Sequence, residues 1–139
     1  RLGQPLSPHL SARLDGVQID INVLQKPATS NSLVIEGAGG LMVPLNDTEL
    51  ILNLIKRLEA KVIVVSQNYL GSINHTLLTL EVLKTNNIAV EGLIFNGTAN
   101  PESEAYIAQY SKVKVLGKIP KMSIVDKESI LKAGQHISI

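Results

Sequence analysis

Short apolar runs and amphipathic segments alternate along most of the chain. Residues 61–65 (KVIVV) are rich in β-branched side chains and show no alternation with polar residues, which is typical of a strand buried on both faces. Residues 89–95 and 112–119 have a similar apolar character and predict two more strands. Apolar residues at helical spacing occupy most of the remaining chain after residue 48. They predict helices over residues 49–60, 73–86, 101–110 and 129–133.

The first third of the chain carries weaker patterns. Pro8 favours the start of a short helix, because the first helical turn tolerates proline. Residues 17–24 alternate in part, which predicts a strand-like start with a weak helical end. Residues 33–35 form a short apolar run, which predicts a buried strand that ends at Glu36.

The alternation of strands and helices predicts an α/β fold. Its mostly parallel sheet should carry helices on both faces, in three layers, within one domain over residues 1–139. Ligands bind such sheets beyond the carboxyl ends of the strands. This rule gathers four segments at one edge of the sheet, namely residues 36–40, 66–72, 96–100 and 120–122.

Composition narrows the classes of function. The 139 residues have a formal net charge of +1 and no basic block, which argues against nucleic acid as the main partner. No apolar stretch approaches the roughly 18 residues of a membrane span, so we expect no membrane partner. The absence of cysteine excludes thiol chemistry and suits a cytoplasmic protein. Because the sequence starts at Arg1 rather than Met, we expect a piece of a longer protein.

Glu36 is followed at once by a glycine-rich turn that runs from Gly37 to Gly40. A carboxylate at the end of a buried strand is costly unless a metal, a cation or backbone N–H groups compensate for its lost hydration. Glycine lets a ligand approach the backbone closely and allows φ > 0. The pattern indicates one edge of a phosphate or metal site. The alternative is a tight turn, with Glu36 in water or capping a nearby N–H.

Two further segments carry candidate binding groups. Residues 70–74 begin a helix after a strand, and the free N–H groups of a first helical turn attract a carboxylate or a phosphate. Alternatively, Ser72 caps its own helix. The amide of Asn96 could pair with the outer edge of adenine, unless Asn96 and Gly97 form only a turn. The sequence contains no G-x-x-x-x-G-K-[ST] phosphate-binding loop, and its three histidines are scattered.

Several of these segments together resemble dethiobiotin synthetase, a member of the P-loop ATPase superfamily. Two motifs are specific as a pair, EGAGG at residues 36–40 followed by a proline, and LGSINHTLLT at residues 70–79. The sequences QPLSPH, GLIFN and LGKIP also match the family pattern. The resemblance implies an ATP-dependent cyclo-ligase of biotin biosynthesis. Such an enzyme closes the ureido ring of dethiobiotin from 7,8-diaminopelargonate and carbon dioxide, through a phosphorylated carbamate.

The resemblance also implies a site and its ligands. Glu36 is similar to a magnesium-ligating carboxylate, so Mg²⁺ and ATP are expected. The residues implied to bind ATP are Glu36, Gly37, Ala38, Gly39, Asn96, Gly97, Pro120, Lys121 and Met122. The residues implied to bind the substrate are Gly71, Ser72, Ile73, Asn74 and Tyr106, the first four across the interface of a homodimer. The acidic residue expected after the last base-binding loop is Asp126 or Glu128.

The chain also departs from the family pattern. The family's phosphate-binding loop, catalytic lysine and second metal-binding aspartate belong to an N-terminal segment that this sequence lacks, so the chain resembles the C-terminal two-thirds of the enzyme. We therefore expect these 139 residues alone to hold half of an ATP site. Gly97 stands where the family often has an aspartate. Two alternatives stay open: a non-catalytic or regulatory remnant that binds a small molecule, and another P-loop ATP-dependent amide-forming enzyme.

Overall fold

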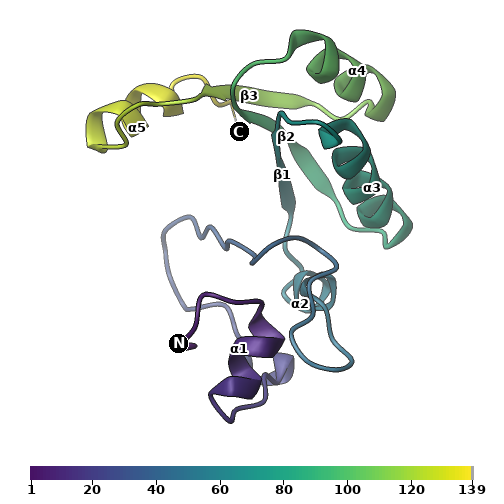
Figure 1. Ribbon diagram of the computed structural model, residues 1–139, viewed down its shortest axis with the longest axis vertical. Coiled ribbons are helices and arrows are strands. Elements are labelled where there is room, and N and C mark those ends of the chain that lie inside the picture. The colour runs from purple at the N-terminus through teal and green to yellow at the C-terminus, as the bar shows by residue number, and fades with distance from the viewer. Residues whose placement is uncertain (139) are drawn as a thin grey trace. The chain divides into compact units, whose positions relative to one another are not determined.

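The computed structural model describes residues 1–138, and Figure 1 labels their elements. The chain divides into two compact units, one formed by Arg1–Ala60 and a second that begins at Lys61. A domain is a part of the chain that folds independently, and a division by contacts does not test independent folding. One domain over residues 1–139 therefore stays a prediction.

The first unit contains short helices around a small aliphatic core. α1 (Pro8–Leu14) carries Pro8 in its first turn, as the sequence predicts. η1 (Ile21–Val23) is a single 3₁₀ turn, and α2 (Ile51–Arg57) is the predicted second helix shortened at both ends. The core of this unit consists of Ile21, Leu45 and Ile51, with Ile19, Val43, Leu54 and Ile55 packed against it.

Two strands predicted in the first unit do not form. Residues 33–35 are an irregular segment in which Val34 is 89% exposed. A buried strand needs backbone partners on neighbouring strands, and residues 32–36 make no backbone hydrogen bond to any described residue. The strand-like start predicted for residues 17–24 does not form, whereas the weak helical end predicted for them is present as η1. A local apolar run therefore indicated a tendency to pair, but it did not reveal whether a partner strand was present.

The second unit is built on a three-stranded parallel sheet. Its strands β1 (Val62–Gln67), β2 (Val90–Gly97) and β3 (Val115–Pro120) lie in the order β1-β2-β3 and correspond to the three later apolar runs. Part of the outer edge of β3 is paired, because the Ser138 N–H donates a hydrogen bond to the Leu116 carbonyl at 2.8 Å. Parallel pairing brings the carboxyl ends of the three strands to one edge of the sheet.

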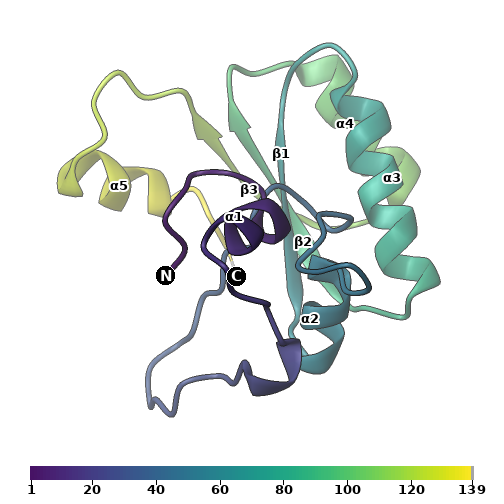
Figure 2. The same cartoon turned by 60° about the horizontal axis from the view of Figure 1, so that its bottom comes forward.

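Three helices accompany this sheet. α3 (Ser72–Thr85) connects β1 to β2, α4 (Pro101–Ser111) connects β2 to β3, and α5 (Lys127–Gly134) follows β3. α3 and α4 lie together on one side of the sheet, whereas α5 lies on the opposite side beside β3 (Figures 1 and 2). The predicted α/β fold, a parallel sheet with helices on both sides, is confirmed.

The core of the second unit lies on the side of the sheet that faces α3 and α4. Leu93 and Phe95 of β2 are buried there, together with Leu83 of α3 and Ile107 of α4. These side chains are largely aliphatic, as expected from a chain with a single phenylalanine and no tryptophan. Their burial holds the central strand in place. It thereby fixes where Asn96, the polar residue that follows Phe95, emerges from the core.

The prediction that β1 is buried on both faces is wrong. Val64 and Ser66 point into the core, and the Ser66 and Thr76 hydroxyls form a hydrogen bond of 2.8 Å that joins β1 to α3. Val65 projects from the other face of β1 and is 59% exposed. An unbroken β-branched run is compatible with burial on both faces, but it does not supply the layer that would cover the second face.

Gly92→Ala should destabilise the second unit. An added Cβ would lie 2.5 Å from the Leu116 Cγ and 2.7 Å from the Lys114 carbonyl oxygen, which belongs to the backbone and cannot rotate away. We expect this overpacking to lower the free energy of unfolding by about 1–3 kcal/mol, measured by urea denaturation. Gly134→Ala is the matched control, because an added Cβ there meets nothing within 4 Å. Equal urea midpoints for Gly92→Ala and the parent chain would contradict this packing.

Candidate functional site

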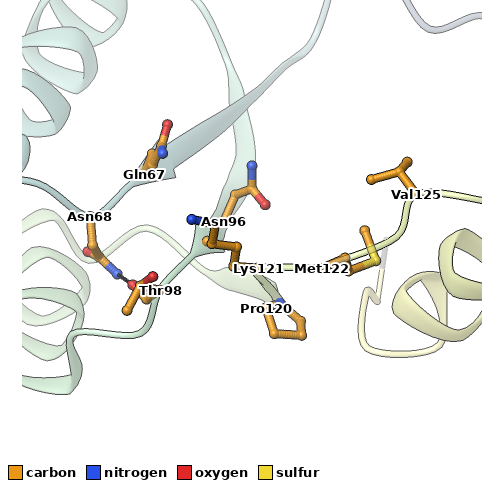
Figure 3. Close-up of a pocket in the computed structure, with 9 residues that line it drawn as sticks. Gln67, Asn68, Asn96, Thr98, Pro120, Lys121, Met122 and Val125 are labelled. Atoms are coloured by element: carbon orange, nitrogen blue, oxygen red, sulfur yellow. Dashed lines mark hydrogen bonds between the residues drawn. The ribbon is translucent and has the colours of Figure 1, made fainter.

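A pocket of about 340 Å³ opens at the carboxyl ends of β1, β2 and β3. Figure 3 shows its lining side chains, which come from the ends of the three strands and from the segments that follow them. The lining residues are Gln67, Asn68, Asn96, Gly97, Thr98, Pro120, Lys121, Met122 and Val125. The pocket thus lies where the topology of a parallel α/β sheet places ligands.

The strand register brings the polar groups of this pocket together. Gln67 of β1 pairs with Asn96 of β2, and Gly97 pairs with Pro120 of β3. The side chains of Gln67 and Asn96 project to the same side of the sheet (Figure 3). Two neighbouring amides offer both donors and acceptors, which suits the edge of a planar, hydrogen-bonding ligand such as a nucleobase.

Gly97 is the last residue of β2 and pairs with Pro120 of β3. Its φ of 100° lies in a region that side-chain-bearing residues rarely adopt. The alternative that Asn96 and Gly97 form only a turn is wrong, because both residues belong to β2 and Asn96 lines the pocket. The chain bends at Thr98, one residue after the end of β2.

A buried carboxylate lies behind the segments that line the pocket. Glu104 of α4 is 3% exposed, and its Oε1 accepts hydrogen bonds from the Asn68 Nδ2 at 2.7 Å and from the Asn100 N–H at 2.9 Å. The Lys118 Nζ lies 2.5 Å from the Glu104 Oε2 and forms an ion pair with it. The Asn68 Nδ2 also donates to the Thr98 carbonyl at 3.0 Å. One carboxylate therefore links segments that belong to, or follow, each of the three strands.

The environment of Glu104 keeps its carboxylate charged. Burial by itself raises the pKa of Glu104, but the Lys118 ammonium, the Asn100 N–H and the Asn68 amide together bring the pKa below its ordinary value of 4.5. The buried negative charge is thus compensated by one cation and two hydrogen-bond donors. This arrangement satisfies the requirement for stable burial of a charge in a protein interior.

The start of α3 contains the residues expected to bind a carboxylate. Gly71 precedes the helix with a φ of 101°, and the Ser72 N–H donates to the Tyr69 carbonyl at 3.0 Å. The N–H groups of Ile73 and Asn74 have no hydrogen-bond partner among residues 1–138, which leaves them available to an anion. The alternative that Ser72 caps its own helix is wrong, because Gly71 is the N-cap residue and no side chain caps this end.

Other predicted site residues lie outside the pocket. Gly71, Ser72, Ile73, Asn74 and Tyr106 do not line it. Tyr106 is half-exposed on α4 and stacks on Tyr110, with 5.9 Å between the ring centroids.

The predicted phosphate and metal segment belongs to the first unit of the chain. Gly39 and Gly40 have φ values of 78° and 130°, so the glycine turn does use backbone conformations that favour glycine. Glu36 is exposed and makes no hydrogen bond or ion pair with any residue from 1 to 138. Gly37 and Ala38 are exposed beside it. The sequence rule placed this segment at the edge of the sheet, and that placement stays a prediction because the sheet belongs to the other unit.

Asp126, one of two candidates for an acidic residue near the base, has a structural role. Its carboxylate accepts a hydrogen bond from the Ser129 N–H at 2.8 Å and caps α5. This bond lowers the pKa of Asp126. Glu128 is exposed in the first turn of the same helix. Neither residue lines the pocket, although Val125 beside Asp126 does.

Sequence reasoning missed several residues of this site. Gln67 and Asn68 lie in the segment 66–72 that the sequence rule gathered at this edge of the sheet, but neither was singled out there as a binding residue. Thr98 likewise lies in the predicted edge segment 96–100, whereas Val125 lies outside all four predicted segments. Glu104 and Lys118 were also missed, because a charged residue on a helix or a strand is normally exposed. Only the packing of α4 against β3 shows that these two form a pair.

The fold and the pocket together define a class of protein. A parallel α/β sheet with a pocket at the carboxyl ends of its strands is typical of nucleotide-binding α/β proteins. A family model described as an AAA domain matches residues 1–129. The chain belongs to this AAA domain family.

Comparison with curated relatives identifies more specific similarities than the family model does. A protein of Cytophaga hutchinsonii named "ATP-dependent dethiobiotin synthetase BioD" is 49% identical over 130 residues, which cover 93% of this chain and 63% of that protein. Proteins of the same name from Christiangramia forsetii and Brucella ovis are 50% and 48% identical, over 91% and 94% of this chain and 60% and 61% of theirs. These matches confirm the resemblance that the motifs indicate. The chain spans about three-fifths of the length of these relatives.

Among residues 1–138, no helix has both the length and the apolar character needed to cross a bilayer.

The Glu104 network should make stability depend on acid pH. Because the pKa of Glu104 is lowered in the folded chain, its stabilising effect is complete above about pH 4.5 and is lost as the pH falls further. The difference in unfolding free energy between the parent chain and Glu104→Gln should therefore shrink below this pH. Urea titrations at several pH values measure this difference. Glu102→Gln, which removes an exposed charge from the same helical turn, should show a smaller change, and an equal change would contradict the prediction.

Proposed function

We propose that this chain is the greater part of an ATP-dependent dethiobiotin synthetase. One observation carries the proposal: the pocket at the three strand ends presents Asn96 beside Gln67, in a chain about 50% identical to proteins of that name. The substrates are 7,8-diaminopelargonate, carbon dioxide and ATP. The active form is a homodimer in the cytoplasm.

The pocket binds the adenine of ATP in this proposal. The Asn96 amide pairs with the donor and acceptor on the outer edge of the base, and Pro120, Lys121 and Met122 close over the ring. Gly97, whose φ of 100° favours glycine, ends β2 directly after Asn96. The pocket volume of about 340 Å³ is at the lower end of the range for small-molecule sites, which suits a site that holds one part of a larger ligand.

The glycine turn and Glu36 serve the phosphate side of ATP. Among the described residues, no group of three or more His, Cys, Asp or Glu side chains could hold a metal. Mg²⁺ commonly takes one or two carboxylates and completes its coordination with phosphate oxygens and water, so a single carboxylate without other partners fits this ion. Glu36 is such a carboxylate, and Gly37, Ala38 and Gly39 allow close approach of the phosphates. When bound, Mg²⁺ neutralises the charge of the transferring phosphoryl group.

The start of α3 holds the carboxylate of the diamine. The N–H groups of Ile73 and Asn74 bind the anion, and Gly71 and Ser72 fix the position at which the helix begins. Tyr106 contacts the carbon chain of the substrate. This arrangement leaves the two amines free at the other end of the molecule, where the ring is closed.

The reaction proceeds in three balanced steps. One amine adds to carbon dioxide and releases a proton, which gives a carbamate. The carbamate oxygen attacks the γ-phosphorus of ATP, so a carbamic–phosphoric anhydride forms and ADP leaves. The second amine attacks the anhydride carbonyl, releases a proton and expels phosphate, which closes the cyclic urea. The protein acts here mainly by positioning the reactants and by neutralising charge.

The defining experiment measures ADP release with Mg-ATP, bicarbonate and 7,8-diaminopelargonate. It compares the 139-residue chain with a full-length protein that carries this segment. We expect turnover that depends on the diamine in the full-length protein. Heat of diamine binding without turnover would replace the proposal with a non-catalytic binding module. Turnover with other amines but not with this diamine would point to another ATP-dependent amide-forming enzyme.

Glu36→Gln in the full-length protein should lower magnesium-dependent turnover by about 100-fold, because the amide cannot supply the negative charge. Thermal stability should be unchanged, since Glu36 is exposed and has no partner among the described residues. Initial rates over a range of MgCl₂ concentrations measure the effect. Glu59→Gln, at another exposed carboxylate of the first unit, is the control. Full turnover in Glu36→Gln would rule out a magnesium role for this residue.

A further inference from the structure

Glu104 contacts the walls of the pocket without lining it. Its Oε1 holds the Asn68 amide, which lines the pocket, and its Oε2 pairs with Lys118, two residues before the pocket residue Pro120. The same Oε1 also accepts from the Asn100 N–H, just after the pocket residue Thr98. Each strand end that contributes to the pocket is therefore connected to this one side chain.

These contacts determine how the Asn68 amide is oriented. The Asn68 Nδ2 donates to both the Glu104 Oε1 and the Thr98 carbonyl, at 2.7 and 3.0 Å. Only the NH₂ group of an amide can donate twice, so the two acceptors define which atom is nitrogen. Without Glu104, the amide would keep a single acceptor on the backbone and would be free to rotate. The Asn100 N–H would lose its partner in the same substitution.

We propose that Glu104 is a positioning residue that sets the nucleobase preference of the pocket by orienting Asn68 and the segment after β2. This inference rests on the proposed function, because it assumes that a nucleotide occupies the pocket. Glu104 acts through Asn68 and touches no ligand. Its burial and its lowered pKa keep the carboxylate charged at neutral pH, so the acceptor that holds Asn68 is always available.

The test uses Glu104→Ala in the full-length protein. We expect the KM for ATP to rise about tenfold, since a hydrogen bond to a charged group is lost, with kcat and the KM for the diamine within about twofold of the parent. The preference for ATP over GTP should fall by a similar factor. Glu104→Gln keeps an acceptor for Asn68 and Asn100 and should recover most of the ATP affinity. Glu102→Ala is the matched control, because it removes an exposed carboxylate from the same turn of α4.

A double-mutant cycle separates positioning from simple stabilisation. If Glu104 acts through Asn68, Glu104→Ala combined with Asn68→Ala should raise the KM for ATP no more than Asn68→Ala alone. Additive effects on KM, or an unchanged base preference with a lowered melting temperature, would overturn the inference. Should Glu104→Ala fail to fold, Glu104→Asp serves the same cycle, because its shorter side chain draws the carboxylate away from Asn68. A parent protein that shows no affinity for ATP would instead refute the proposed function.

Discussion

Parallel pairing of the three strands is the constraint on which the second unit depends. The hydrogen-bond ladder places Gln67 opposite Asn96 and Gly97 opposite Pro120, so the three strand ends are level with one another. The burial of Leu93 and Phe95 fixes this register, because a slip of one residue would turn both side chains away from α3 and α4. The pocket is thus a direct consequence of the sheet.

In the second unit, a few interior polar groups connect the helices to the sheet. The Ser66 and Thr76 hydroxyls join β1 to α3, and the Glu104–Lys118 pair joins α4 to β3. Hydrophobic contacts are not directional, so an aliphatic core alone would tolerate small shifts between a helix and the sheet. Hydrogen bonds and the Glu104–Lys118 ion pair are directional, and they define where each helix lies. The segments that line the pocket begin at the ends of these strands, so fixing the strands against the helices also fixes the pocket-lining segments.

The second unit was largely predictable from the sequence, because its strands and helices have strong apolar periodicity and short connections. Asn96, Pro120, Lys121 and Met122 were predicted to lie at one edge of the sheet, and they do line one pocket. Residues 33–35 were predicted wrongly as a strand, since apolar character does not reveal whether a partner strand is present. Glu104 could not be predicted, because the burial of a charge depends on a cation from another element, which no local pattern shows.

The unequal exposure of the Glu104–Lys118 pair has an evolutionary consequence. The Lys118 side chain is 59% exposed, whereas that of Glu104 is 3% exposed. Losing Glu104 first would leave an ammonium that water can solvate, but losing Lys118 first would leave a buried anion without its cation. Substitution of the pair therefore has a favoured order, in which position 104 becomes neutral before position 118 changes. Lineages that keep Glu104 should keep a cation at position 118.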